Sequence, residues 1–265
     1  MSFDPSPAAE ALLAARGPRD PSMGNPSMGD PGPLDPAIAP HDDAEGIAVQ
    51  LALAHRMGAI PPAGFKIGAT AQRMREYLGV SGPIAGFMPP AAIHRSGASL
   101  AHAAFRNPGV ECEIGVRLAH DFSPGPCTQE QAAEGVAELF AAIEIVENRY
   151  PATRDVPLLI ADQMFHAAAV LGDPGEWRRY DLPSFAGRLM VGPETRGEGR
   201  ARDLLGHPMA ALAWLASSRE AAAFGGLKRG QVCMLGSVCP PVWLDGPCEV
   251  MVQFEYLAQV RVSFT

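Results

Sequence analysis

The sequence predicts a mixed α+β fold in which helices surround a curled, mainly antiparallel sheet. Two observations lead to this prediction: short strand-like runs bounded by Gly and Pro outnumber the helical segments, and the last two runs lie close enough to form a hairpin. The runs are 64–70, 110–118, 141–148, 188–192, 231–237, 248–254 and 259–264. A doubly wound parallel sheet is less consistent with this order.

The N-terminal part of the chain predicts a short helix and a linker ahead of a globular domain. Residues 1–16 contain the helix-forming run AAEALLAAR, whereas 17–40 are rich in Pro and Gly and repeat PSMG, which is typical of linkers. From His41 onward, acids in the first turn, apolar residues at helical spacing and Gly58 as a stop predict a helix. The sequence therefore predicts two parts, residues 1–41 and a domain over 42–265.

Further helices are predicted between the strand-like runs. Their positions are 71–78, 128–141, 163–171 and 208–223. The last of them has the clearest ends, because Pro208 lies in its first turn and Gly225 and Gly226 follow it.

Composition and motifs exclude several classes of function. The 29 acidic residues outnumber the 21 basic ones and give a net charge of −8, so the basic surface of a nucleic-acid-binding protein is missing. The N-terminus does not resemble a signal peptide, no apolar run is long enough to span a membrane, and the five cysteines lack CxxC spacing. P-loop, HExxH, GxSxG and GxGxxG motifs are absent. We therefore expect a cytoplasmic protein that binds neither nucleic acid nor membrane.

Three carboxylates on two strand-like runs form a candidate metal site. In VECEIGVRL, apolar and polar residues alternate, which places Glu111 and Glu113 on one face about 7 Å apart. Glu144 lies inside the apolar run AAIEIVEN, where an unpaired carboxylate would be costly. A shared cation would remove these penalties and form an oxygen site of the Mg²⁺ or Mn²⁺ type. The alternatives are a solvated strand face and an ion pair of Glu144 with Arg149 or Arg117.

Lys66 is the candidate acid or base of this site. Only Lys66 and Lys228 are lysines, and Lys66 lies in GFKIGAT between apolar residues and two glycines that let the backbone approach a ligand. Partial burial is expected to lower its pKa toward the working range of a catalytic group. The alternative is a strand lysine whose stem is buried and whose ammonium group reaches solvent.

Two further polar residues are candidates for substrate binding. Asp162 follows VPLLI, where it could be the N-cap of the next helix or face the same site. Ser237 ends QVCMLGS, where its hydroxyl could hold a carboxylate or stabilise a turn. The seven histidines show no metal-ligand spacing, so none is assigned to the site.

These segments together resemble the 2-keto-4-pentenoate hydratase branch of the fumarylacetoacetate hydrolase superfamily, which includes 2-oxohept-4-ene-1,7-dioate hydratase and 4-oxalocrotonate decarboxylase. The resemblance covers residues 42–265 and depends on blocks that follow in order: GFKIGAT, VECEIGVRL, AIEIVENR, LIADQMFHAAAVLG, GHPMAALAWLA and LKRGQVCMLGS. It implies a mixed β-roll of the type found in the C-terminal domain of fumarylacetoacetate hydrolases, with surrounding helices. It also implies a homo-oligomer that acts in aromatic catabolism.

The resemblance implies a chemistry as well. Glu111, Glu113 and Glu144 would hold Mg²⁺ or Mn²⁺, and a 2-oxo or 2-hydroxy-dienoic acid would chelate that metal. Lys66 would lie beside the substrate. In the hydratases this lysine assists ketonisation before water adds to the double bond, and in the decarboxylases the same metal-bound 2-oxo system accepts electrons as carbon dioxide leaves.

The sequence departs from the family pattern in three places. The segment 82–94 carries no carboxylate where hydratases usually have an aspartate, Glu147-Asn148 stands where Asp-Ser is common, and ADQ replaces ADN. We predict a metal-dependent lyase of the hydratase type, with 2-oxo acid decarboxylation as the alternative because it needs no water-activating carboxylate. Two further alternatives are carbon–carbon hydrolysis of an acylpyruvate and a catalytically degraded relative that only binds a 2-oxo acid.

Overall fold

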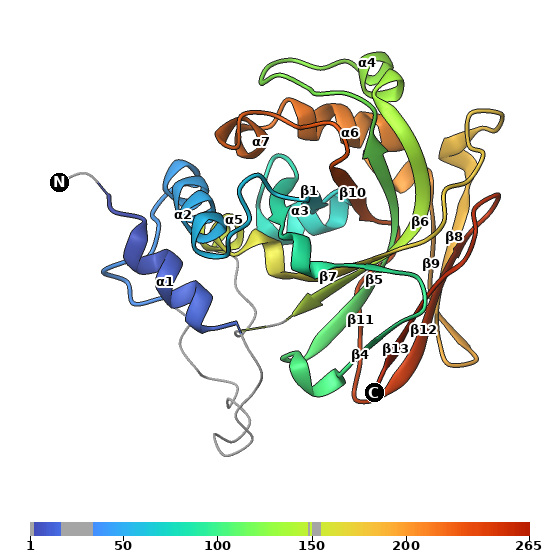
Figure 1. Cartoon of the computed structure of the whole chain (residues 1–265), viewed down its shortest axis with the longest axis horizontal. Helices are drawn as coiled ribbons and strands as arrows, with labels where there is room; N and C mark the ends of the chain where they lie inside the picture. The colour runs from blue at the N-terminus through green and yellow to red at the C-terminus, as the bar shows by residue number, and fades with distance from the viewer. Residues whose placement is uncertain (1–2, 17–33, 148, 150–154) are drawn as a thin grey trace.

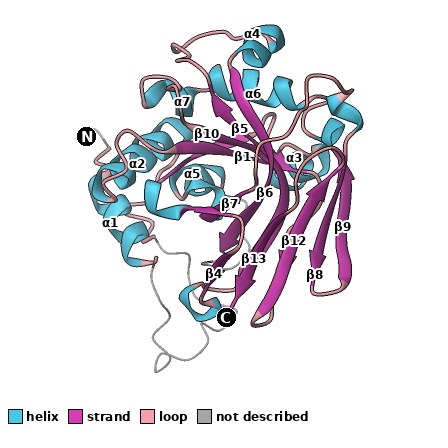
Figure 2. Cartoon of the chain, turned by 45° about the vertical axis from the view of Figure 1, so that its right-hand side comes forward, coloured by secondary structure: helices cyan, strands magenta, loops and turns pink. Residues whose placement is uncertain are grey.

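Two β-sheets form the centre of the molecule in a computed structural model of the chain (Figures 1 and 2). The structure describes residues 3–16, 34–147, 149 and 155–265. Most of the longer helices pack around the first sheet, while the second sheet extends from its lower edge (Figure 2). This arrangement of mixed sheets and separate helices confirms the predicted α+β class.

The first sheet contains eight strands within the described residues. Their order is β2 (Ile84–Met88), β1 (Gly64–Gly68), β10 (Val232–Ser237), β5 (Pro108–Leu118), β6 (Val136–Glu147), β7 (His166–Leu171) and β3 (Ile93–Arg95), with β11 (Val242–Trp243) paired to β5. Neighbouring strands are antiparallel except for β1 with β10 and β3 with β7. The long pair of β5 and β6 runs through the middle of this sheet and carries the candidate metal ligands.

The second sheet is smaller. Its order is β4 (Ala98–Leu100), β13 (Val260–Phe264), β12 (Cys248–Phe254), β8 (Ala186–Val191) and β9 (Glu194–Arg200). β12 and β13 pair antiparallel, which confirms the predicted hairpin. Their inward apolar residues, among them Val252 and Val262, belong to the same core as the first sheet.

The described helices agree only in part with those that the sequence predicts. They are α1 (Ser6–Ala14), α2 (Asp43–Arg56), α3 (Gln72–Leu78), α4 (Gln129–Glu134), α5 (Val156–Ala161), α6 (Pro208–Ala216) and α7 (Arg219–Ala223), with 3-10 turns at Pro90–Ala92, His102–Ala104, Gln163–Phe165, Leu182–Ser184 and Ala201–Asp203. α2 begins after Asp42, whose side chain accepts a hydrogen bond from the backbone of Glu45. It ends just before Gly58, which has a φ of 64°.

The N-terminal helix α1 packs against α2 (Figure 1) and buries Ala8, Ala9 and Leu12 completely. After this helix, Arg16 forms an ion pair with Asp162. Residues 3–16 are therefore part of the globular body. Most of the predicted linker, including the PSMG repeat, lies outside the described residues, so the predicted division at residue 41 stays a prediction.

Two of the predicted helices are wrong over most of their length. The segment 128–141 is helical only as far as Glu134, and β6 begins at Val136. The segment 163–171 forms one turn and then strand β7, although its alanines favour a helix. In both places, pairing with neighbouring strands overrides the local helix propensity. The prediction also misses α5, β2, β3, β4, β9 and β11, and the segment 208–223 forms two helices instead of one.

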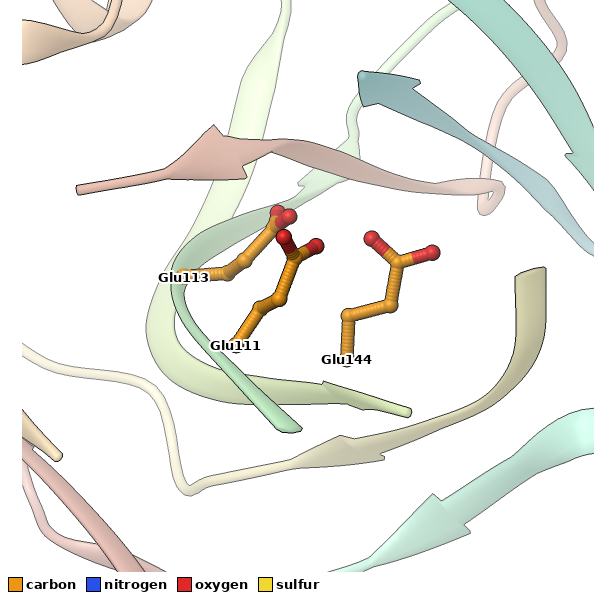
Figure 3. Close-up of side chains that lie close together, drawn as sticks. All are labelled: Glu111, Glu113 and Glu144. Atoms are coloured by element: carbon orange, nitrogen blue, oxygen red, sulfur yellow. The ribbon is translucent and has the colours of Figure 1, made fainter. Parts of the chain in front are cut away.

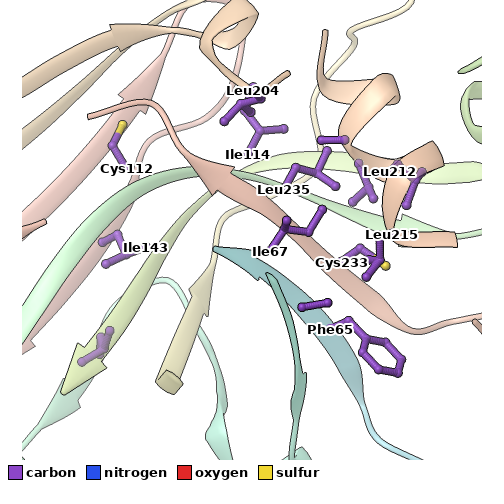
Figure 4. Close-up of a cluster of buried hydrophobic side chains, with 14 of the residues drawn as sticks. Phe65, Ile67, Cys112, Ile114, Ile143, Leu204, Leu212, Leu215, Cys233 and Leu235 are labelled. Atoms are coloured by element: carbon purple, nitrogen blue, oxygen red, sulfur yellow. The ribbon is translucent and has the colours of Figure 1, made fainter. Parts of the chain in front are cut away.

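The two faces of the first sheet carry different residues. On one face, Phe65, Ile67 and Leu235 lie beneath Leu212 and Leu215 of α6 in the main core (Figure 4). The opposite face carries the candidate site and a second buried apolar cluster. The members of that cluster are Met88, Phe140, Ala142, Ala169, Leu171, Val232 and Met234.

Candidate metal centre

Glu111, Glu113 and Glu144 gather on one face of the first sheet (Figure 3). Glu111 and Glu144 are direct register partners on β5 and β6, and Glu113 lies two residues further along β5 on the same face. One oxygen from each carboxylate lies within 4.8 Å of the other two. Glu113 and Glu144 are fully buried and Glu111 is half-buried, so a solvated strand face is ruled out. The predicted convergence of the three side chains is present.

Each of the two buried carboxylates is held through one oxygen. The backbone N–H of Gly236 donates to Oε2 of Glu113 at 2.9 Å. Oε1 of Glu144 lies 3.1 Å from Nζ of Lys66 and 2.9 Å from Nδ1 of His166. The other oxygen of each residue, Oε1 of Glu113 and Oε2 of Glu144, is buried without a hydrogen-bond partner in the described part of the chain. Two orphaned carboxylate oxygens at one site are a specific reason to expect a cation there.

Lys66 is buried to 1% exposure, so the alternative in which its ammonium group reaches solvent is wrong. Its Nζ donates to the carbonyl of Met164 at 3.0 Å and pairs with Glu144. Burial by itself lowers the pKa of Lys66, but Glu144, Glu111 and Glu113 outweigh that effect and the pKa is raised. The expectation of a lowered pKa is therefore wrong, because the ammonium group lies among three carboxylates.

The charges of the cluster match a divalent cation. Burial by itself would raise the pKa of Glu144, but Lys66 and His166 hold it at about 2. Burial and the charge of Glu144 raise the pKa of Glu111 to about 8, and that of Glu113 lies well above its usual value. One ammonium group thus compensates one carboxylate. Three ionised carboxylates and one ammonium leave two negative charges, which one oxygen-binding dication would balance.

His166 is a site residue that the sequence reasoning missed. Its ring is 1% exposed, and its Nε2 is buried without a partner among the described residues. Burial lowers the pKa of His166, and the neighbouring Glu144 offsets this only in part. No motif could have found it, since it is brought to Glu144 by an irregularity of β7 that its sequence does not signal.

The turn before β7 adopts a backbone conformation that is rare for residues with side chains. Gln163, Met164 and Phe165 have φ values of 56°, 48° and 68°, which is one left-handed turn made without glycine. Two glycines of the adjacent strands make room for it. A Cβ at Gly86 would lie 2.8 Å from the Cα of Gln163, and one at Gly68 would lie 2.5 Å from Cγ of Met164. The second glycine of GFKIG therefore serves the packing of this turn.

Asp162 follows α5 and stands at the N-cap position of the 3-10 turn Gln163–Phe165, but its side chain makes no capping hydrogen bond. Its buried carboxylate forms ion pairs with Arg149 and Arg16. Burial would raise the pKa of Asp162, but the two arginines keep it below its usual value. Arg117 pairs with another glutamate of β6, so the alternative in which Arg149 or Arg117 neutralises Glu144 is also wrong. A contact of Asp162 with substrate stays a prediction.

Ser237 lies at the edge of the metal cluster. It is the register partner of Glu113 across β10 and β5 and is half-buried. Its hydroxyl donates to the carbonyl of Cys239 at 2.6 Å, which leaves the oxygen lone pairs as acceptors. Its predicted contact with a substrate likewise stays a prediction.

No protein-family model matches the chain. Among curated proteins it is similar to the 2-keto-4-pentenoate hydratase of Burkholderia vietnamiensis strain G4, with 30% identity over 207 residues that cover 76% of this chain and 78% of the relative. It is 28% identical over 210 residues to the 2-hydroxyhexa-2,4-dienoate hydratase of Comamonas testosteroni, with the same shares of the two chains covered.

Solved structures share the fold. The 4-oxalocrotonate decarboxylase from Pseudomonas putida G7, complexed with magnesium and adipate, has a TM-score of 0.78 at 23% identity and covers 84% of this chain and 86% of its own. The fumarylpyruvate hydrolase from Pseudomonas aeruginosa, in complex with Mn²⁺ and pyruvate, has a TM-score of 0.57 at 17% identity and covers 76% and 88%. These matches confirm the predicted β-roll architecture. Within the described residues, no helix has the length and apolar character needed to cross a membrane.

Proposed function

The chain belongs to the 2-keto-4-pentenoate hydratase family, and on that premise we propose that it is a metal-dependent lyase that adds water to a short 2-hydroxy-dienoic acid. One observation carries the proposal. Three carboxylates converge on one face of the sheet, and the buried ammonium group of Lys66 lies beside one of them. A dication and a proton donor are the two groups needed to stabilise an enolate and protonate it.

The residues of the site divide between cation binding and proton transfer. Glu111, Glu113 and Glu144 would hold Mg²⁺ or Mn²⁺, which suit an all-oxygen ligand set. When bound, the cation supplies electrophilic stabilisation of the negative charge that develops on the substrate's 2-oxygen. Lys66 holds a proton at Nζ, and the carbonyl of Met164 fixes the direction of the ammonium group. We assign protonation of the substrate to Lys66, because its raised pKa keeps the proton on Nζ.

The surroundings of the glutamates support a substrate with an apolar remote end. The face of the sheet that carries Glu144 also carries Phe140, Ala142 and Ala169, all buried. Ala169 is the direct register partner of Glu144, so a small side chain leaves room beside the carboxylate. An uncharged tail, as in a hexadienoate, suits such a surface. Ser237 remains our candidate for holding the substrate carboxylate, for which its hydroxyl would have to turn its proton away from the carbonyl of Cys239.

Decarboxylation of a 2-oxo acid is the second candidate, and one feature of β2 favours it. This strand pairs with β1 so that Gly86 lies opposite Lys66, and all five of its residues are buried and uncharged. The segment 82–94 therefore brings no carboxylate to the side of Lys66 for activating water. Decarboxylation needs stabilisation of the enolate but no such group.

Three further properties are proposed from the family alone. We place the enzyme in the cytoplasm, as a homo-oligomer, in the breakdown of aromatic compounds. Sedimentation of the purified chain tests the oligomer directly, and a monomer at micromolar concentration would contradict it.

Calorimetric titration with oxalate, a mimic of a 2-oxo-acid enolate, tests the proposed site. Binding is expected with Mg²⁺ and not with chelator, and Glu111→Gln is expected to abolish it. Glu138→Gln, which changes a half-exposed glutamate of β6 that pairs with Arg117, is the matched control.

Loss of ultraviolet absorbance from a 2-hydroxy-dienoate then reports hydration, and carbon dioxide release reports decarboxylation. Absence of metal-dependent binding would refute both readings.

A further inference from the structure

The hydrogen bond between His166 and Glu144 has a consequence for how the metal is bound. Nδ1 of His166 lies 2.9 Å from Oε1 of Glu144, and Nζ of Lys66 lies 3.1 Å from the same oxygen. A carboxylate only accepts hydrogen bonds, so Nδ1 carries the proton. Two buried donors thus converge on one oxygen, and Oε2 is left without a partner in the described part of the chain.

His166 reaches Glu144 through a shift in strand register. On β7, Ala169 pairs with Glu144 and Ala168 with Ile145, but His166 pairs with Val146, so Ala167 is an extra residue. In a regular strand His166 would lie three positions from Ala169 and face away from Glu144. The extra residue reverses that alternation and turns the imidazole onto the face of the glutamates. Register shifts of this kind re-aim side chains next to functional sites.

The backbone of His166 is held in place as well. The carbonyl of His166 accepts a hydrogen bond from Nη2 of Arg149. Arg149 is itself buried between the carboxylates of Glu147 and Asp162. The residues just before His166 form the left-handed turn, whose shape the two glycines of neighbouring strands permit. The direction of the ring is therefore fixed on both sides before any ligand arrives.

A carboxylate that lacked this hydrogen bond would have more freedom. The terminal torsion of glutamate is broad and roughly two-fold, so rotation exchanges its two oxygens and permits either oxygen, or both, to face a cation. His166 and Lys66 together hold Oε1 and remove that choice. Partners that orient a ligand in this way commonly change metal affinity by about 10- to 100-fold when they are removed.

We propose that His166 is a positioning residue of the metal centre, whose Nδ1–H holds Oε1 of Glu144 so that Oε2 alone is presented to the divalent cation. The proposal rests on the proposed metal-dependent function. It assigns His166 no contact with the cation and no proton transfer.

Two variants of similar shape separate the hydrogen bond from the volume of the ring. His166→Asn keeps an N–H donor close to the position of Nδ1, whereas His166→Leu has a similar branched outline without a donor. Binding of Mn²⁺ to the full chain is measured from the loss of the free-ion electron paramagnetic resonance signal. We expect His166→Leu to weaken Mn²⁺ binding by about 10- to 100-fold and His166→Asn to stay within about threefold of the wild type. Equal affinity in the wild type and the Leu variant, or equal loss in both variants, would overturn the proposal.

Mn²⁺ binding by the wild-type chain distinguishes a failure of this proposal from a failure of the proposed function on which it rests. If the wild-type chain binds no Mn²⁺, the metal site fails and His166 has nothing to position. If it binds and the two variants do not differ, only the role of His166 fails. Nitrogen chemical shifts of the imidazole in the wild type need no variant and cover the case in which the Leu variant does not fold. We expect the proton on Nδ1, and a neutral ring protonated only on Nε2 would overturn the proposal.

Discussion

The site joins two regions that are built in different ways. The strand region consists of Lys66 on β1, Glu111 and Glu113 on β5 and Glu144 on β6, and it follows regular alternation. The turn region, residues 162–166, consists of three left-handed residues and a strand that starts out of register. The strand region carries the charges of the candidate metal centre, and the turn region supplies the contacts of Met164 and His166 that orient Lys66 and Glu144. This difference indicates that regular strands set which groups meet, while an irregular segment sets their directions.

Replacing Lys66 gives the largest expected effect and tests the strand region for chemistry. Lys66→Met keeps the length of the side chain and removes the proton at Nζ. Turnover should fall by about 10²- to 10⁴-fold, while Mg²⁺ affinity should not decrease, because one positive charge leaves the neighbourhood of the glutamates. Steady-state rates and calorimetry measure the two quantities.

Lys228→Met is the control for this substitution, since Lys228 is the other lysine and pairs with Asp121 on the surface. It should leave both quantities unchanged. Unaltered turnover in Lys66→Met would remove the assigned role of Lys66, and a parallel loss of Mg²⁺ affinity would make that residue part of the metal-holding framework instead.

Replacing Asp162 tests the turn region for stability. Asp162→Asn leaves Arg149 and Arg16 without their shared buried carboxylate, which should cost about 3 kcal/mol in the free energy of unfolding near pH 7. The pKa of Asp162 is lowered in the folded state, so its stabilisation is present above the unfolded value and is lost as pH falls below about 4. Urea unfolding across that range should show the difference between wild type and variant shrinking in acid.

Asp121→Asn is the matched control, because Asp121 is more than half exposed. A change of less than about 0.5 kcal/mol is expected for it. If Asp162→Asn were equally mild, the buried ion pairs would not be what holds the turn region in place.

Adding a methyl group at Gly86 tests the contact between the two regions. A Cβ there would lie 2.8 Å from both Cα and Cβ of Gln163, so Gly86→Ala must displace the left-handed turn and should cost about 1–3 kcal/mol. Gly82→Ala is the control, because the nearest atom to a Cβ there, Nε1 of Trp214, would lie at 3.8 Å. Urea unfolding gives the cost, and Mn²⁺ affinity reports whether the displacement reaches His166. Equal stability of the two variants would show that the turn tolerates movement.

The same comparison explains what the sequence could and could not reveal. Alternation in VECEIGVRL places Glu111 and Glu113 on one face, because side-chain direction in a regular strand has period two. The carboxylate of Glu144 in an apolar run indicates a shared cation, but the sequence alone leaves an ion pair with Arg149 or Arg117 open. The same pattern does not predict that His166 faces the site. A register shift in β7 reverses the alternation of side chains there, and no residue of that segment signals the shift. The pKa of Lys66 was predicted in the wrong direction because burial was considered without the charges that surround it. The segment 163–171 became a strand through pairing that local propensity does not encode.

The last and smallest expected effect, counted per pH unit, is the pH dependence of metal binding. It distinguishes the two regions, because the pKa of Glu111 in the strand region is raised whereas that of Asp162 in the turn region is lowered. Burial and Glu144 raise the pKa of Glu111 to about 8, so near pH 7 the metal-free site holds a proton that a cation must displace. Mg²⁺ affinity should therefore rise by at least about tenfold per pH unit below pH 8, equivalent to about 1.4 kcal/mol per unit, because the pKa of Glu113 is raised as well and its proton adds to the slope. Calorimetry in two buffers of different ionisation enthalpy should show proton release.

Asp162→Asn should leave the slope of Mg²⁺ affinity against pH unchanged, because the pKa of Asp162 is already lowered and its carboxylate stays ionised throughout. A flat profile in the wild type would mean that neither Glu111 nor Glu113 holds a proton before metal arrives, which would contradict the raised pKa of both groups.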